Sequence, residues 1–537
     1  MLSLCLFGSN VKPNTNRTQK RKKKTSILGK RKGNGSFPNS TTGGGTLTGG
    51  GKGGVPTPGK KVKKQRSASY TSHKGSSVSK VGKSSEGRSR SHQYTLAQSD
   101  ILRQAAYAIG RLVEADATGK HGVSLKSLTL GKNVRQKKAV YAVTVETLKY
   151  YSVLKSLVNE VFRGDFGGMS EATLCVLVRE IVLGDGISRI GRAERLVLEK
   201  EEELKRELSN LVEQSGVQSV ADMLPQNELM VAAAKRKRTL RVNLAKVSVE
   251  EVKNQLMEEF QSVSISEHLP DVIELDPGSD LHSHTLVRSG NVVLQSLASC
   301  IPASVLDPEP HWHVIDACAA PGNKTTHLAA IMSHKATGTS DVRGKVFAFD
   351  KDTRRLEILK KNVALTGTTS IIEPSCRDFL EADPSEFARV DAILLDPSCS
   401  GSGTAVSRMD YLLPNSSQHV SQRGVMHVDE RVLSLKQFQI SVIQHAMSFP
   451  NVKKIVYSTC SIYYEENEGV VAHVLEFAKE HGFHVAEVFP SWPRRGLVLQ
   501  QEERQEDILP AGEARKVLRV DPIEDGTDGF FVAIFVK

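Results

Sequence analysis

The segment HVIDACAAPGNKT, residues 313–325, decides the fold class of this chain. A short apolar strand runs into Asp316, a turn of small residues with Pro321 and Gly322 follows, and a helix begins near Asn323. Four later segments repeat an apolar strand that ends in a polar or acidic turn, with helical stretches between them: KVFAFDKDTRRLEILKKNVAL, SIIEPSCRDFL, VDAILLDPSCSGSG and VKKIVYSTCS. This alternation predicts an α/β fold with a doubly wound, mostly parallel sheet, whose functional groups gather at the carboxyl ends of the strands.

Residues 301–537 form the domain of this sheet in our interpretation, and a helical domain lies upstream. The last segment, GFFVAIFVK at 529–537, predicts a buried strand that is antiparallel and lies at the edge of the sheet. From 94 to 235, apolar residues recur at intervals of three and four, which predicts a small helical domain. Three leucines share one stripe, which we interpret as a packing face rather than a site for a coiled-coil partner: Leu204, Leu208 and Leu211.

Between these domains, residues 236–300 change pattern. TLRVNLAKV (239–247) predicts a strand, and SVEEVKNQL predicts a helix opened by a Ser248/Glu251 capping box. We therefore expect a small α+β subdomain, and we expect it to bind RNA. KRKR at 235–238 is the strongest basic patch outside the N-terminal tail.

The basic charge of the chain is concentrated in residues 1–93. They hold 21 Lys and Arg against one acidic residue, Glu86, so the tail carries +20 and the rest of the chain −8. The tail is rich in Gly, Ser, Thr and Lys and cannot bury enough apolar surface to fold, so we predict that it is disordered. Its basic runs, RKKK (21–24) and KKVKKQR (60–66), are typical of nuclear import signals or of an RNA-binding tail. A solvated arm and an organelle transit peptide are the alternatives.

Composition excludes several classes of protein. A chain of 537 residues with 39% hydrophobic residues is long enough for about three folded units. Its seven cysteines, an odd number with wide spacing and no CxxC pair, disfavour a disulfide scaffold and a structural zinc site. We therefore expect a reducing intracellular compartment and no bound metal. No apolar run approaches the ~20 residues that a membrane span requires, so we expect no membrane partner.

The turn after the first strand of the sheet indicates the kind of cofactor. It has no G-x-G-x-x-G, the glycine fingerprint that lets a backbone approach a dinucleotide pyrophosphate, whereas S-adenosylmethionine has no phosphates and does not require it. Asp316, Asp350 and Asp378 end three successive predicted strands, where carboxylates can hold ribose hydroxyls or lie near an adenine. Each acid alone is more often a helix cap or a solvated turn residue. Their joint arrangement favours a nucleoside that carries a sulfonium.

Four motifs resemble one known family: DACAAPGNKT (316–325), FAFDKDTRRL (347–356), DPSCSGSG (396–403) and YSTCSIYYEENEGVV (457–471). They resemble the Nop/Sun group of RNA cytosine-C5 methyltransferases, which is related to bacterial Fmu-type enzymes, and the similarity covers about 95–537. Most members have Asp-Val/Ala-Pro-Cys in the third motif and glycine at position 323. Asp-Pro-Ser-Cys with Asn323 instead resembles the branch that methylates large-subunit ribosomal RNA, the fifth Nsun member of animals and its fungal counterpart. Ser296, where the family usually has Asp, is a departure.

This resemblance implies a class I methyltransferase-type fold that binds S-adenosylmethionine. The residues that it places at the cofactor are Cys318, Ala319, Ala320, Pro321, Gly322, Asn323, Lys324, Asp350, Arg355, Asp378 and Asp396. Cys318 would line the pocket through its backbone. Arg355 and Asp350 would pair beside the cofactor, with an ordinary surface salt bridge as the alternative.

Methylation at C5 of cytosine requires a cysteine. The C5 carbon is a poor nucleophile until a thiolate adds to C6, and a base must afterwards remove the C5 proton so that the thiolate can leave. Such a cysteine needs a lowered pKa beside the methyl donor. The attack comes from above the ring, so the target must be single-stranded or flipped out of its stack.

Two cysteines qualify by position, Cys399 and Cys460. In related DNA enzymes the Pro-Cys cysteine attacks, which favours Cys399, but the family resemblance assigns attack to Cys460 and release of the product to Cys399. Cys460 directly ends the strand KIVYSTC, whereas Cys399 lies in a glycine-rich loop that can move. The resemblance further implies that Asp396 hydrogen-bonds cytosine N3 or N4 and that Lys324 reaches toward the base.

Each of these residues also has an ordinary structural interpretation. Lys324 could be an exposed lysine in the first turn of a helix, although the helix dipole disfavours a cation there. An intracellular cysteine is most often a small buried hydrophobe, and we give that interpretation to Cys175, Cys300 and Cys376.

The sequence thus predicts an enzyme that makes 5-methylcytosine in RNA, not DNA, with large-subunit ribosomal RNA or a pre-ribosome as its partner. The basic tail favours the nucleus and its nucleolus, with an organelle as the alternative. Two other functions stay open: methylation of tRNA, and ribosome assembly with the methyltransferase fold as a scaffold. The four intact residues of the catalytic motifs argue against an inactive scaffold: Cys399, Cys460, Asp396 and Lys324.

Overall fold

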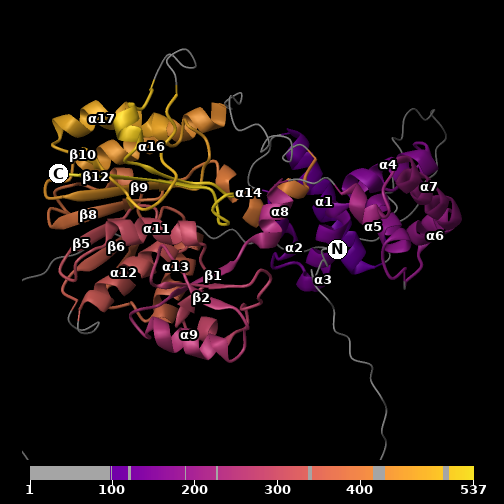
Figure 1. The fold of residues 1–537 in the computed structure, drawn as a ribbon, viewed down its shortest axis with the longest axis horizontal. Helices are drawn as coiled ribbons and strands as arrows, with labels where there is room; N and C mark the ends of the chain where they lie inside the picture. The colour runs from indigo at the N-terminus through magenta and orange to yellow at the C-terminus, as the bar shows by residue number, and fades with distance from the viewer. Residues whose placement is uncertain are drawn as a thin grey trace, which may run out of the picture. The chain divides into compact units, whose positions relative to one another are not determined.

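A computed structural model describes residues 97, 99–118, 123–187, 189–224, 228–336, 342–414, 430–499 and 507–537 (Figure 1). The predicted tail, residues 1–93, lies outside the described residues, and so do its basic runs. None of the helices in these ranges is both long enough and apolar enough to cross a membrane.

The first part of the described chain is helical, as the apolar spacing predicts. Its helices are α1 (Asp100–Thr118), α2 (Leu125–Thr129), α3 (Lys137–Lys149), α4 (Tyr151–Phe162), α5 (Glu171–Val182), α6 (Arg192–Leu198), α7 (Glu201–Gln214) and α8 (Glu228–Lys235). Leu204 and Leu208 of α7 are buried and Leu211 packs partly buried against the same core, so their interpretation as a packing face is confirmed. Leu412 and Leu413 from the later chain join this core.

The next part is a small antiparallel sheet. Its strands are β1 (Arg238–Val242), β2 (Val263–Ile265), β3 (Val272–Leu275) and β4 (Val292–Val293), in the order β2-β3-β1-β4. The helices α9 (Val249–Met257) and α10 (Thr285–Arg288) complete it. The predicted strand over 239–247 ends early, at Val242, because Asn243 begins a turn in which its carbonyl accepts the N–H of Lys246 at 2.9 Å. Ser248 caps α9 and accepts the N–H of Glu251, as predicted, but the return contact from the Glu251 side chain that would complete a capping box is not among the contacts of the described residues.

The large sheet carries the fold class. Its strands are β5 (His313–Asp316), β6 (Lys345–Phe349), β7 (Ile372–Ser375), β8 (Val390–Leu395), β9 (Lys454–Thr459), β10 (His484–Ala486), β11 (Leu518–Val520) and β12 (Phe530–Val536). The order is β10-β12-β9-β8-β5-β6-β7, with β11 paired to β12. All pairs from β7 to β9 are parallel, and the pairs of β12 are antiparallel. The predicted doubly wound, mostly parallel sheet is confirmed.

Helices cover both faces of this sheet. On one face lie α11 (Leu297–Leu306), α12 (Asn323–Lys335) and α13 (Thr353–Thr366), and on the other α16 (Glu430–Met447) and α17 (Glu468–Glu480) (Figure 1). Neighbouring strand residues alternate between the two cores, so Val314 packs with the first set of helices and Ile315 with the second. Both faces of the sheet are therefore apolar, and the polar side chains of a functional site lie at the ends of the strands.

The strand β12 corrects one prediction. It is buried and antiparallel, as GFFVAIFVK predicts, but it is not at the edge of the sheet. It lies between β9 and β10, and β11 pairs with it as well. The short strands β10 and β11 have only three residues each, too few for the sequence pattern to predict them as its neighbours.

Candidate active site

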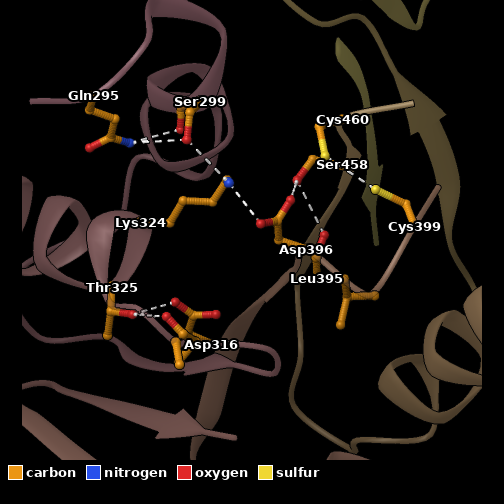
Figure 2. A network of polar contacts seen from close by, with 12 residues as sticks. Gln295, Ser299, Asp316, Lys324, Thr325, Leu395, Asp396, Cys399, Ser458 and Cys460 are labelled. Carbon is orange, nitrogen blue, oxygen red and sulfur yellow. Dashed lines mark hydrogen bonds and ion pairs between the residues drawn. The ribbon is translucent and has the colours of Figure 1, made fainter. Parts of the chain in front are cut away.

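The two candidate cysteines meet where neighbouring parallel strands end. Cys460 directly follows β9, and Cys399 lies four residues beyond the last residue of β8. Their Sγ atoms are 3.3 Å apart, and both side chains are half-buried (Figure 2). The Cys460 turn is held by Asn467, whose Oδ1 accepts the Thr459 hydroxyl at 2.5 Å and whose Nδ2 donates to the Ser461 carbonyl at 2.9 Å.

The surroundings of the two thiols differ. The hydrogen bond between the two thiols lowers the pKa of Cys460, with help from the Lys324 ammonium and against burial and the Asp396 carboxylate. The same hydrogen bond, burial and the negative charge of Glu466 raise the pKa of Cys399 well above its usual value. The pKa values of the two thiols therefore shift in opposite directions, which favours the thiolate on Cys460 rather than on Cys399.

Asp396 and Lys324 form an ion pair beside the cysteines. Lys324 Nζ lies 2.7 Å from Asp396 Oδ2 and donates to Ser299 Oγ at 3.4 Å, and the Ser458 hydroxyl donates to Asp396 Oδ1 at 3.0 Å (Figure 2). Burial acts to lower the pKa of Lys324, but the Asp396 carboxylate outweighs it and the pKa is raised. The lysine is only 12% exposed, so the alternative of an exposed first-turn lysine is wrong.

The predicted cofactor turn lies between β5 and α12. Its carbonyl groups are bound from α13: Arg355 Nη2 donates to the Ala320 carbonyl at 2.5 Å, and Asn362 Nδ2 donates to the Pro321 carbonyl at 2.8 Å. Gly322 has φ +104°, and a Cβ there would meet the Leu359 side chain at 3.3 Å. Only glycine suits this position, which starts α12 as its N-cap residue.

Asp350 holds the same turn from the end of β6. Its Oδ2 accepts the Ala320 N–H at 3.3 Å and lies 3.2 Å from Arg355 Nη1, while its Oδ1 accepts the Asp352 N–H at 2.9 Å. The Asp350 side chain is 3% exposed although Arg355 is half exposed. The pair therefore belongs to the wall of the turn and is not an ordinary surface salt bridge.

Asp378 departs from the expected position at a strand end. The strand β7 ends at Ser375, and Asp378 instead caps a short 3₁₀ helix, Phe379–Glu381, by accepting the Leu380 N–H at 3.1 Å. Its other partner is Lys351 Nζ, at 3.7 Å. The cap explains its place in the sequence, and a contact with the cofactor stays a prediction.

The acids around the turn fit S-adenosylmethionine. Burial raises the pKa of Asp316 to about 7, although its Oδ2 accepts the Thr325 hydroxyl at 2.7 Å. Its Oδ1 is buried and accepts no hydrogen bond from the described residues. An orphaned buried acceptor at one strand end, with the Asp350 carboxylate at the next, suits a ligand that brings an amine and ribose hydroxyls. The residues that would hold it are Asp316, Asp350, Arg355 and the turn 318–323.

The Cys399 loop is more firmly held than the glycine pattern indicates. The Gly403 N–H donates to the Cys460 carbonyl at 2.9 Å, and the Gly529 N–H donates to the Gly403 carbonyl at 2.8 Å. A Cβ on Gly403 would lie 2.2 Å from the Gly529 carbonyl oxygen. Gly403 therefore serves close backbone packing, and movement of this loop stays a prediction.

Two further sequence interpretations are corrected. Cys175 and Cys300 are buried, and burial raises the pKa of each to about 12, but Cys376 is exposed and is not a buried hydrophobe. In the KRKR segment, Arg236 Nη1 lies 2.8 Å from Asp528 and Lys237 Nζ lies 2.7 Å from Glu274. Two of the four basic residues are therefore already paired, and the segment is not a simple basic patch.

The sequence analysis missed several polar residues of the site. Ser458 and Ser299 bind the Asp396–Lys324 pair, and Glu466 and Gln439 bind the Cys399 loop. Ser458 and Glu466 lie inside the motif YSTCSIYYEENEGVV (457–471), which was the available signal for them, whereas no motif marks Ser299 or Gln439.

Two regions of the chain match models of known protein families. Residues 303–536 match the family model described as 16S rRNA methyltransferase RsmB/F, and residues 138–224 match the N-terminal domain of NOL1/NOP2/Sun domain family member 5. The crystal structure of PH0851 superposes with a TM-score of 0.54 at 22% sequence identity, covering 81% of this chain and 98% of that one. This last similarity shows that the two chains share a fold.

Curated relatives extend the match over most of the chain. The Arabidopsis thaliana 25S rRNA (cytosine-C(5))-methyltransferase NSUN5 is 38% identical over 439 residues, which cover 81% of this chain and 72% of the relative. The Mus musculus 28S rRNA (cytosine-C(5))-methyltransferase is 34% identical, over 80% of this chain and 90% of the relative. The Schizosaccharomyces pombe 25S rRNA (cytosine-C(5))-methyltransferase rcm1 is 33% identical, over 78% and 88%. The chain therefore belongs to the NOL1/NOP2/Sun family of S-adenosylmethionine-dependent RNA cytosine-C5 methyltransferases, in the branch of NSUN5.

Proposed function

We propose that this protein methylates C5 of a cytosine in large-subunit ribosomal RNA. The relatives that match most of its length are named for that reaction. The observation that carries the proposal is the meeting of Cys460, Cys399, Asp396 and Lys324 at the ends of β8 and β9, next to the cofactor turn. These are the groups that addition to a pyrimidine ring requires.

Cys460 is the nucleophile. Its lowered pKa favours the thiolate, which is the form that can make a bond to C6 of the cytosine. Negative charge then moves onto the ring, and C5 becomes able to attack. When bound at the turn 318–323, S-adenosylmethionine supplies an activated methyl group on a sulfonium.

Asp396 and Lys324 orient the base and balance its charge. The carboxyl group of Asp396 is placed to hydrogen-bond N3 or N4 of the cytosine, and the Ser458 hydroxyl and Lys324 fix its orientation. The Lys324 ammonium, buried beside both groups, stabilises the negative charge that develops on the ring. Neither residue has to move far, because both project from the ends of rigid elements.

Cys399 serves the release step. After methyl transfer, the C5 proton must leave so that the C5–C6 double bond can form again and the bond between Cys460 and C6 can break. Water takes the C5 proton, and the thiol of Cys399, 3.3 Å from the sulfur that must leave, can hydrogen-bond that sulfur as the C6–S bond breaks. Cys460 then departs as a thiolate, and the methylated RNA is free.

The test is methylation of defined RNA. Purified protein, labelled cofactor and large-subunit rRNA should give transfer to a single cytosine, which bisulfite sequencing maps. Small-subunit rRNA and total tRNA are the controls. Transfer to tRNA but not to rRNA would contradict the proposed substrate, and binding of rRNA without transfer would leave only a scaffold role.

The cellular setting follows from the substrate. Large-subunit rRNA is made and first processed in the nucleolus, so we place the protein there, with a pre-ribosome as its partner. A fluorescent fusion of the full chain should accumulate with a nucleolar marker, and accumulation in an organelle would contradict this placement.

A further inference from the structure

Both peptide bonds of Cys399 are bound by one buried pair of side chains. Gln439 Nε2, from α16, donates to the Ser398 carbonyl at 3.1 Å, on one side of the cysteine. The Ser400 N–H, on the other side, donates to Glu466 Oε1 at 2.9 Å. Gln439 Nε2 also donates to Glu466 Oε1 at 3.0 Å, which joins the two contacts. The backbone of Cys399 is thus clamped to Gln439 and Glu466.

Glu466 is an unusual residue to find in this clamp. Its side chain is fully buried, and its Oε2 finds no hydrogen-bond donor among the described residues. Its backbone is fixed, because the Tyr457 hydroxyl donates to the Glu466 carbonyl at 2.6 Å. Leaving one oxygen of a buried carboxyl group without a hydrogen-bond donor costs stability. Such a cost indicates that the charge of the Glu466 carboxylate has a functional role.

The charge of Glu466 acts on the two thiols. They are chemically identical and their sulfurs are 3.3 Å apart, so in equal surroundings they would share one proton about equally. The surroundings are unequal: the anion Glu466 acts on Cys399, and the cation Lys324 acts on Cys460, where nearby anions oppose it. The other charged groups that act on the pair are Asp396, on both thiols, and Asp528, on Cys460.

We propose that Glu466 is a positioning residue that assigns the roles of the two cysteines. It holds Cys399 against Cys460 through the Ser400 N–H, and its negative charge keeps the shared proton on Cys399, so that Cys460 carries the thiolate. Gln439 supplies geometry alone, and Glu466 supplies geometry and charge. This inference rests on the proposed function in one respect, that Cys460 is the attacking sulfur.

The experiment labels the thiolate directly. Full-length protein, without RNA or cofactor, is treated at neutral pH with limiting iodoacetamide, and peptide mass spectrometry gives the ratio of label on Cys460 to label on Cys399. In the wild type, label should collect on Cys460. Glu466→Gln retains an oxygen for Ser400 and Gln439 but removes the charge, and it should shift the ratio toward Cys399 by about tenfold, as expected for the loss of one charge from a buried site.

Two further variants separate charge from geometry. Glu466→Asp keeps the charge and should leave the ratio close to that of the wild type. Gln439→Met removes the other side of the clamp but leaves the charge, so it should shift the ratio much less than Glu466→Gln does. Circular dichroism and cofactor binding confirm that each variant is folded.

Three results would overturn the inference: label on Cys399 first in the wild type, an unchanged ratio in Glu466→Gln, or equal shifts in Glu466→Gln and Gln439→Met. The wild-type result stands even if a variant fails to fold. Because no RNA is present, a failure here is distinct from a failure of the proposed rRNA substrate.

Discussion

The Cys460 turn and the Cys399 loop occupy equivalent places, since each follows a central strand of the large sheet, yet they are built differently. The Cys460 turn continues β9, which is paired on both sides by β8 and β12, and Asn467 secures it. The Cys399 loop extends four residues beyond β8 and depends on side chains from α16, on Glu466 and on packed glycines. Both are firmly mounted, so it is charge and not rigidity that distinguishes the two sulfurs.

The strongest test of this difference is Cys460→Ala. Without the thiolate no bond to C6 can form, so methyl transfer should fall by at least about 10⁴-fold and no covalent protein–RNA complex should appear. The measurement is labelled methyl transfer together with a denaturing gel for the adduct. Cys376→Ala, at an exposed cysteine outside the site, is the matched control and should keep full activity. An adduct that persists in Cys460→Ala would reverse the assignment of the two cysteines.

Cys399→Ala should impair only the release of the methylated RNA. Attack and methyl transfer continue, but release slows, so a covalent complex accumulates and steady turnover falls by roughly 10²–10³-fold, as expected when one positioned hydrogen-bond donor to the leaving group is lost. Single-turnover and multiple-turnover assays on the same gel separate the two steps. Equal losses in both assays, with no trapped complex, would contradict a release role for Cys399.

Lys324→Met should make the Cys460 thiol less reactive. It removes the ammonium that helps to lower the Cys460 pKa and leaves the Asp396 carboxylate, which raises it, so the Cys460 pKa rises. Less thiolate then exists at neutral pH, the pH at which iodoacetamide labels half of Cys460 moves upward, and methylation at pH 7 falls by roughly 10–100-fold. Lys335→Met, at the far end of the same helix, is the control. An unchanged pH profile of labelling would show that Lys324 does not tune this thiol.

Gly403→Ala should displace the Cys399 loop. Of the four variants it should have the smallest effect on activity. The new Cβ would press on the Gly529 carbonyl oxygen, and the strain, about 1–3 kcal/mol, displaces the loop from β12. Turnover should fall by about tenfold with some adduct trapped, while label on Cys460 persists. Gly512→Ala, where the added Cβ meets nothing within 4 Å, is the control. A variant with normal release would mean that the glycine contact does not position Cys399.

Much of this site could be predicted from the chain itself. The alternation after 313 predicts the sheet, because apolar strands with polar ends have few other folds, and the motif residues Asp396, Cys399 and Cys460 come together because parallel strands end at one edge. Asp378 shows the limit of that argument. Its strand ended early, and an aspartate that caps a helix looks the same in sequence as one that faces a ligand.

The rest depends on contacts between distant residues. Gln439 and Glu466 are 27 positions apart and meet only because α16 and the start of α17 pack on the same face of the sheet. The place of β12 inside the sheet depends on short strands with no clear pattern, and Arg236 meets Asp528 across 292 positions. No local periodicity encodes such pairings, whereas helix spacing and strand alternation are local and were therefore predictable.

The position of β12 has a consequence for the synthesis of the chain. Residues 530–536 emerge from the ribosome after every other strand of the sheet, yet they pair with β9 along its length and bring Gly529 against Gly403. Until they are made, one edge of β9, the strand that Cys460 directly follows, is unpaired. The Cys399 loop also lacks the contact between Gly403 and Gly529. Cys460 and Cys399 can therefore take up their final arrangement only late in translation, and we expect a stop codon shortly before residue 530 to abolish activity although all four sequence motifs would still be present.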